Sequence, residues 1–125
     1  MKQSPNEDVF YEITFYERLL EKYPDYGEAL SLLSELYTKI GQHEKGLETD
    51  LRLTKLRPED PIAHYNLACS YSLLRRPKEA LEALEHSISL GYNDLSFLQK
   101  DKDLQGLREE PGYQALLDKY FRKSS

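Results

Sequence analysis

The chain has 125 residues, of which 39% are hydrophobic and 31% charged, with one cysteine and a net charge of −5. These values are typical of a single helical domain, and they exclude an internal disulfide and a metal site built from several cysteines. Residues 1–60 hold 8 basic and 13 acidic residues, so we expect neither nucleic acid nor an anionic membrane as a partner.

The N-terminal residues 1–7 are polar and lack the apolar stretch of a secretory signal. No apolar run in the sequence reaches the length of a membrane span, so we expect a cytoplasmic protein. A first helix is expected from about Asn6–Asp8 to Lys22, because Pro24 disfavours helix at the preceding residue.

The first helix has apolar residues on nearly all sides, more than a one-sided surface helix needs. Left in water, some of them would form an apolar patch of a size that is rare on monomers. We therefore predict an oligomer surface, covered in a homodimer or by another partner, that consists of Val9, Phe10, Ile13 and Tyr16. The alternative is that residues 1–7 or side-chain repacking hide these residues.

A regular spacing recurs along the next part of the chain. Pro24 and Pro58 lie 34 positions apart, and Tyr92 follows after another 34. Helices are expected over residues 27–40, 43–56, 61–74 and 77–90, with Gly41 and Gly91 as left-handed caps. A repeat of this period indicates stacked helical pairs. With no strand-like alternation anywhere, the sequence predicts an all-α superhelix, a solenoid of antiparallel helical hairpins.

The pattern changes after Gly91. Short pieces are expected around Asp101 and Asp103, followed by a last helix over residues 111–122. This tail is similar to the segment that closes many bacterial repeat proteins, with a DxDLxxLRxxPxYxxLL run from Asp101 to Leu117.

Residues 27–94 resemble two tetratricopeptide repeats. One unit reads LxxLSxxY and the next HxxLAxxY, and both carry a small residue where the paired helices of this family approach closely. The departures from the family pattern are Asp50, His64 and Tyr92. The resemblance implies one domain over residues 1–125. It divides into a half-repeat helix (8–26), two repeats (27–60 and 61–94) and C-terminal capping helices (95–125).

The resemblance also implies a function: an adaptor or scaffold that binds a peptide or helix of another protein in a concave groove. By family position, the groove residues are Glu28, Ser31, Glu35, Thr38, Ile62, Tyr65, Asn66, Cys69 and Lys100. Asn66 occupies the position that contacts a peptide backbone or terminal carboxylate in the family, or it is simply the consensus scaffold residue. Glu28 and Glu35 would suit a basic or polar ligand segment.

Catalytic, cofactor and metal sites are not expected. His43, His64 and His86 lack the spacing of a zinc site, and the glycines do not form a phosphate-binding loop. Cys69 has no nearby cation in its helix to stabilise a thiolate, which favours a packing role. The alternative to a groove-binding module is a self-assembling structural subunit that dimerises through its apolar first helix.

Overall fold

The computed structural model describes the backbone of residues 5–121 and the side chains of residues 8–121. The elements are α1 (Pro5–Lys22), α2 (Gly27–Lys39), α3 (His43–Leu56), α4 (Pro61–Leu73), α5 (Pro77–Ser89), α6 (Leu95–Lys100), a 3₁₀-helix η1 (Lys102–Leu107) and α7 (Pro111–Phe121). Every regular element within residues 5–121 is helical, which confirms the all-α prediction. Helices α2 to α5 end within one residue of the expected bounds, whereas α1 begins slightly earlier. Two expectations concern parts of the chain whose side chains the structure does not describe. One is that residues 1–7 cover the apolar side chains of the first helix, and the other is that the last helix ends near Arg122.

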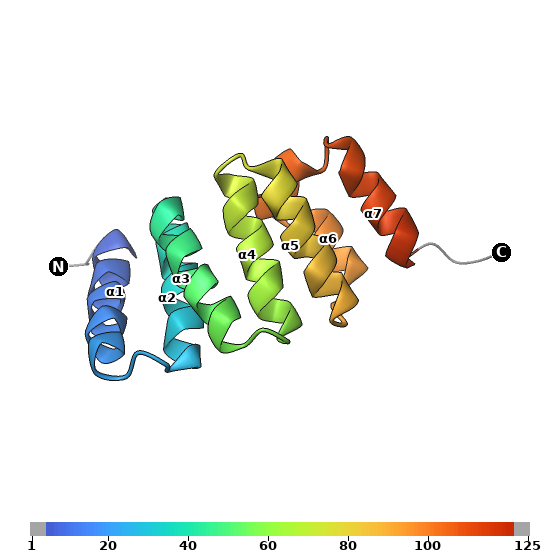
Figure 1. Ribbon diagram of the computed structural model, residues 1–125. Coiled ribbons are helices and arrows are strands. Elements are labelled where there is room, and N and C mark those ends of the chain that lie inside the picture. The colour runs from blue at the N-terminus through green and yellow to red at the C-terminus, as the bar shows by residue number, and fades with distance from the viewer. Residues whose placement is uncertain (1–4, 122–125) are drawn as a thin grey trace.

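The helices follow one another along a row, as Figure 1 shows. Helices α2 and α3 pack against each other, as do α4 and α5, and α3 joins the two pairs by packing on α4. Helix α1 packs on α2 at one end, while η1 contacts α4 and α7 contacts α5 at the other. Helices α1 to α5 therefore contact mainly their neighbours in the chain, as in a repeat superhelix, whereas η1 and α7 pack back on α4 and α5.

The core consists of two clusters of buried apolar side chains. The first lies among α1, α2 and the facing sides of α3 and α4, and includes Ile13, Leu30 and Leu53. The second extends from α3 through α4 and α5 into the C-terminal segment, and includes Leu84 and Leu104. Because the clusters follow the row of helices, the C-terminal segment is part of the core and not an appendage.

Specific contacts hold the C-terminal segment in place. The Asp101 carboxylate caps η1 by accepting a hydrogen bond from the Asp103 backbone N–H at 3.0 Å. The Arg108 guanidinium donates to the carbonyls of Leu98 at 2.9 Å and Asp101 at 2.6 Å. These bonds satisfy backbone carbonyls at the ends of short helices, where intrahelical partners are missing. The acidic and arginine positions of the tail motif therefore have a structural role here.

Gly41 and Arg75 occupy equivalent positions in the two hairpins, just after α2 and α4. Both have left-handed backbone, with φ of 78° and 59°. A side chain in this conformation costs about 1 kcal/mol, which glycine avoids. We expect Arg75→Gly to raise the free energy of unfolding by about 0.5–1 kcal/mol and Gly41→Ala to lower it by a similar amount. Urea denaturation of both variants measures the effect, and a stability loss in Arg75→Gly would show that the arginine side chain matters more than its backbone.

Candidate functional site

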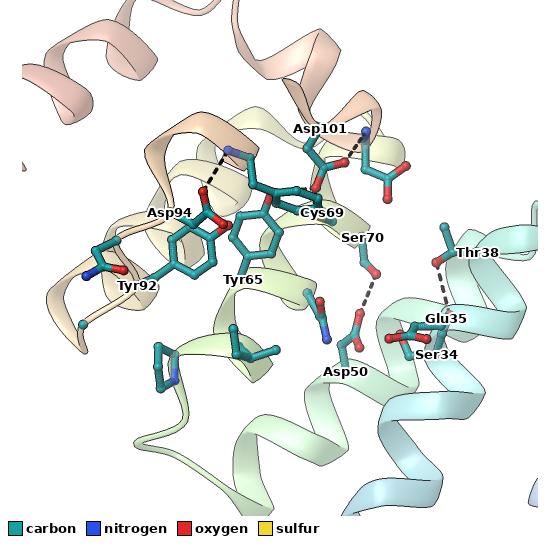
Figure 2. A pocket seen from close by; sticks show the side chains of 17 residues that line it. Ser34, Glu35, Thr38, Asp50, Tyr65, Cys69, Ser70, Tyr92, Asp94 and Asp101 are labelled. Carbon is teal, nitrogen blue, oxygen red and sulfur yellow. Dashed lines mark hydrogen bonds between the residues drawn. The ribbon is translucent and has the colours of Figure 1, made fainter. Parts of the chain in front are cut away.

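A cavity of about 680 Å³ lies between the two helical pairs and the C-terminal segment. Its walls come from α2, α3, α4, the α5–α6 connection, α6 and η1, as Figure 2 shows. The lining residues are Ser34, Glu35, Thr38, Asp50, Pro61, Ile62, Tyr65, Asn66, Cys69, Ser70, Gly91, Tyr92, Asn93, Asp94, Phe97, Asp101 and Asp103. The cavity thus combines aromatic and aliphatic side chains with several carboxylates.

Asp50 is fully buried where α3 faces the cavity. Its Oδ2 accepts a hydrogen bond from the Ser70 hydroxyl at 2.6 Å, drawn in Figure 2. Burial raises the pKa of Asp50 to about 6, against the opposing effect of nearby Ser34 and Ser70 hydroxyls. Although Ser34 is close, Oδ1 accepts no hydrogen bond of ordinary geometry from the described residues. Asp50, which stands where the family pattern has an apolar residue, is therefore a buried acid beside the cavity.

A stacked pair of tyrosines forms one side of the cavity. The rings of Tyr65 and Tyr92 lie nearly parallel, with centroids 4.5 Å apart. The Tyr65 hydroxyl donates to Asp101 Oδ2 at 2.6 Å, which connects α4 to the capping segment. Burial and this hydrogen bond raise the pKa of Tyr65 well above its usual value. The stack and the bond together fix the wall, and the phenol stays protonated at neutral pH.

Cys69 is buried next to the same carboxylate, with Sγ 3.8 Å from Asp101 Oδ2. Burial, followed by the negative charges of Asp101, Asp103 and Asp50, raises the pKa of the thiol well above its usual value. A protonated thiol is a poor nucleophile, because reactivity resides in the thiolate. The surroundings of Cys69 therefore disfavour covalent chemistry.

Two groupings of potential metal ligands arise from the fold and were not expected from sequence spacing. Ligand atoms of Cys69, Asp101 and Asp103 all lie within 4.8 Å of one another. The imidazole rings of His64 and His86 have centroids 4.1 Å apart and planes tilted by 31°, and His64 Nε2 lies 2.8 Å from the Pro58 carbonyl oxygen. Within the described residues, this histidine pair gains no third ligand from a cysteine, histidine or carboxylate.

The structure brings most of the predicted groove residues together. Six of the nine line the cavity: Glu35, Thr38, Ile62, Tyr65, Asn66 and Cys69. The other three do not. Glu28 instead forms an ion pair with Arg57 at 3.0 Å, Ser31 is half-buried away from the cavity, and Lys100 is exposed at the end of α6.

Sequence reasoning missed the side chains that the capping segment contributes. Phe97, Asp101 and Asp103 reach the cavity because α6 and η1 fold back near α4, a helix that lies far away in the sequence. No repeat register predicts this return, because the tail lacks the period of the two repeats. Asp50 carried a detectable signal, since it is a charged residue at an otherwise apolar repeat position.

The predicted oligomer surface on α1 needs correction. Ile13 is buried in the core, and Val9 and Tyr16 are half-buried against α2, so these three do not form an open patch. Phe10 is exposed, as expected. The large apolar side chains of α1 that are exposed are Phe10, Tyr11 and Phe15. The helix does carry an apolar outer face, but a different set of residues forms it.

Comparison with known proteins supports the repeat assignment. A tetratricopeptide repeat family model matches residues 62–91, which contain most of α4 and α5. A chloroplastic protein of Arabidopsis thaliana is 33% identical over 87 residues, 67% of this chain and 26% of that protein. The protein CTR9 homolog of the same plant is 48% identical over 52 residues, 42% of this chain and 5% of that protein.

A TPR repeat-containing protein of Picosynechococcus sp. is 39% identical over 62 residues, 50% of this chain and 16% of that protein. The chain thus spans between 5% and 26% of the length of these relatives. Among residues 5–121, no helix is both long and apolar enough to cross a membrane. The matched hairpin, its counterpart one repeat earlier and the stacked helical architecture agree with one another. The chain is therefore a tetratricopeptide repeat protein.

Proposed function

We propose that the chain is a non-catalytic protein–protein interaction module that binds a segment of a partner in the cavity between its helical pairs. The main support for this function is the preformed cavity, which has apolar side chains exposed at its rim. Ile62 is 52% exposed and Phe97 is 54% exposed, and both line the cavity. Exposed apolar groups beside a concave surface are typical of binding sites.

The rigid surroundings of the cavity favour binding without rearrangement of the module. The Tyr65–Tyr92 stack, the bond from Tyr65 to Asp101 and the Asp50–Ser70 bond all hold its walls in place. A preformed site spends little free energy on ordering its own side chains when a ligand binds. An extended peptide or a helix of the partner fits this description. A catalytic role is disfavoured because the Cys69 thiol and the Tyr65 phenol both have raised pKa values.

The experiment is affinity purification from the native host with wild-type protein and two double variants. Ile62→Ala with Phe97→Ala should lose the partner, because it removes the exposed apolar contact area of the cavity, and truncating a main contact of an interface costs about 2 kcal/mol or more. Phe10→Ala with Phe15→Ala is the matched control, since it removes two exposed side chains far along the row, on α1. If the partner is retained by the first variant and lost by the second, the groove proposal is wrong.

A second candidate is self-association through α1, favoured by the exposed rings of Phe10, Tyr11 and Phe15. A second copy of the chain would cover this face. Sedimentation velocity over a range of concentrations separates the two functions. A mass that rises with concentration in wild type but not in the Phe10→Ala, Phe15→Ala variant supports self-association, whereas a constant monomer mass excludes it. The division into a half-repeat, two repeats and a cap, and the cytoplasmic location, stay predictions.

A further inference from the structure

The cavity carries a concentration of negative charge. Five of its lining residues are acidic: Glu35, Asp50, Asp94, Asp101 and Asp103. Of the described residues that line it, none is Lys, Arg or His. Burial and the neighbouring Asp101 raise the pKa of Asp103, against a smaller opposite effect of His43 on α3, which does not line the cavity. The carboxylates therefore share a cavity that no described basic side chain lines, although the Arg108 guanidinium binds the backbone carbonyl of Asp101 close by.

The protein itself does not neutralise these carboxylates with ion pairs. The salt bridges among the described residues join Arg57 to Glu28, Arg76 to Glu79 and Lys119 to Glu85, and none reaches the cavity. The buried Oδ1 of Asp50 accepts no hydrogen bond of ordinary geometry from the described residues, although the Ser34 hydroxyl is close, and this is a second and independent sign of an incomplete site. A buried carboxylate oxygen without a donor is costly, so positive charge brought near it by a ligand is stabilising.

The remaining walls suit a long side chain with a cationic end. The exposed Ile62 and Phe97 lie at the rim, and the Phe97 ring is 6.1 Å from that of Tyr65. Lysine and arginine pack their methylene stems on apolar surface while the charged end reaches polar groups, and aromatic rings attract the cation further. The cavity offers both kinds of contact in one place.

We propose that this cavity recognises a Lys or Arg side chain of the partner segment. The stem would pack against Ile62 and Phe97, and the cation would lie among the carboxylates of Glu35, Asp50 and Asp103. This inference rests on the proposed function, because it names the chemistry of the residue that the groove selects. It also agrees with the net charge of −5.

A metal ion is a poorer occupant of the same cavity. Cations such as calcium require about six to eight oxygen ligands close around one point. The cluster of Cys69, Asp101 and Asp103 offers few, and Asp101 Oδ2 already accepts the Tyr65 hydroxyl. The raised pKa of the Cys69 thiol also means that this ligand is protonated. A Lys or Arg side chain would contact the apolar rim as well as the carboxylates, whereas a metal ion would interact only with the carboxylates.

The test selects binders from a random heptapeptide display library on wild type and on matched charge variants. Glu35→Gln with Asp103→Asn removes two cavity charges whose side chains accept no hydrogen bond within the described structure, so folding should persist, as circular dichroism can verify. Asp25→Asn with Glu109→Gln removes the same number and kinds of charge from exposed positions outside the cavity. The Ile62→Ala, Phe97→Ala variant reports on the groove itself.

Peptides recovered on wild type should be enriched in Lys or Arg, and the enrichment should disappear on Glu35→Gln, Asp103→Asn but persist on Asp25→Asn, Glu109→Gln. By calorimetry, replacing the enriched residue of a selected peptide with Leu should weaken binding about 10- to 100-fold, as for a lost charge-assisted hydrogen bond. Equal enrichment on both charge variants would overturn the inference.

The other outcomes separate this inference from the proposed function. If binders require Ile62 and Phe97 but lack basic residues, the groove proposal stands and cation recognition is wrong. If the selected peptides bind equally well to the Ile62→Ala, Phe97→Ala variant, the groove proposal and cation recognition are both wrong. A rise in melting temperature with calcium chloride that disappears in Glu35→Gln, Asp103→Asn would indicate a metal site and also overturn the inference.

Discussion

Replacing Asp50 with Asn is expected to raise the free energy of unfolding at pH 7 by about 1–3 kcal/mol, because it removes a buried charge. Burial raises the pKa of Asp50 from 3.8 to about 6, and each pKa unit corresponds to about 1.4 kcal/mol. Asparagine keeps an oxygen that can accept the Ser70 hydroxyl, so the shape of the site is preserved. Its amide adds two buried N–H donors, which reduces the net gain.

The pH dependence of this effect has a definite sign. Because the folded-state pKa of Asp50 lies above its unfolded-state value, the folded state binds more protons between pH 4 and 6. The contribution of Asp50 is therefore fully present below about pH 4 and is lost as the pH rises through about 6. The advantage of Asp50→Asn over wild type should be absent near pH 4 and appear by pH 7. Urea denaturation at both values measures it, and a stability difference that does not change with pH would show that Asp50 titrates normally.

The same substitution should weaken the interaction of the cavity with a basic peptide. The carboxylate of Asp50 contributes negative charge beside the cavity that asparagine does not supply. A change that stabilises a protein while reducing its binding is common where a strained or charged group serves function. This trade-off gives a physical reason for a buried acid at a repeat position that otherwise favours an apolar residue.

Leu104→Ala is expected to lower the free energy of unfolding by about 2–5 kcal/mol, the usual range for a leucine truncated in a packed core. Leu104 is fully buried in η1 and belongs to the same cluster as Leu84 of α5. The surrounding backbone is held by the Asp101 cap and the Arg108 guanidinium, so the site cannot easily collapse to fill the space.

The matched control for Leu104→Ala is Leu32→Ala, which truncates a leucine that is 42% exposed on α2. Its cost should be below about 1 kcal/mol, as for most surface substitutions. Urea denaturation measures the free energy of unfolding of both variants, and a dependence on urea concentration equal to that of wild type verifies two-state unfolding. Equal and small losses in the two variants would mean that the C-terminal segment is not an integral part of the core.

The helices could be predicted from the sequence because their signals are local and repeated. Proline at Pro24, Pro58, Pro61 and Pro77 marks helix boundaries, and the regular spacing sets the register of both hairpins. The resemblance to tetratricopeptide repeats, applied in that register, implied that Ile62, Tyr65, Asn66 and Cys69 face the groove, and all four line the cavity. The repeat register and the resemblance together therefore predicted the half of the site that the repeats supply.

The other half of the site depends on contacts that no period encodes. Asp101 lies in the capping segment, far along the chain from Tyr65, yet their side chains share a hydrogen bond. Likewise, the outward face of α1 could not be chosen, because apolar residues surround that helix and only packing on α2 buries Ile13 and leaves Phe10 exposed. Sequence patterns predict the helices well, and tertiary packing decides which of their side chains remain exposed for binding.

Site-specific photo-crosslinking in the native host measures most directly whether the cavity is the partner-binding surface. A photoreactive amino acid is placed at Asn93, an exposed residue that lines the cavity, or at Tyr11, which is 68% exposed on α1. Crosslinked species are then identified by mass spectrometry. We predict a specific partner crosslinked from Asn93 and absent from Tyr11. Crosslinks from Tyr11 alone, whether to a partner or to a second copy of the chain, would mean that α1 and not the cavity is the interaction surface.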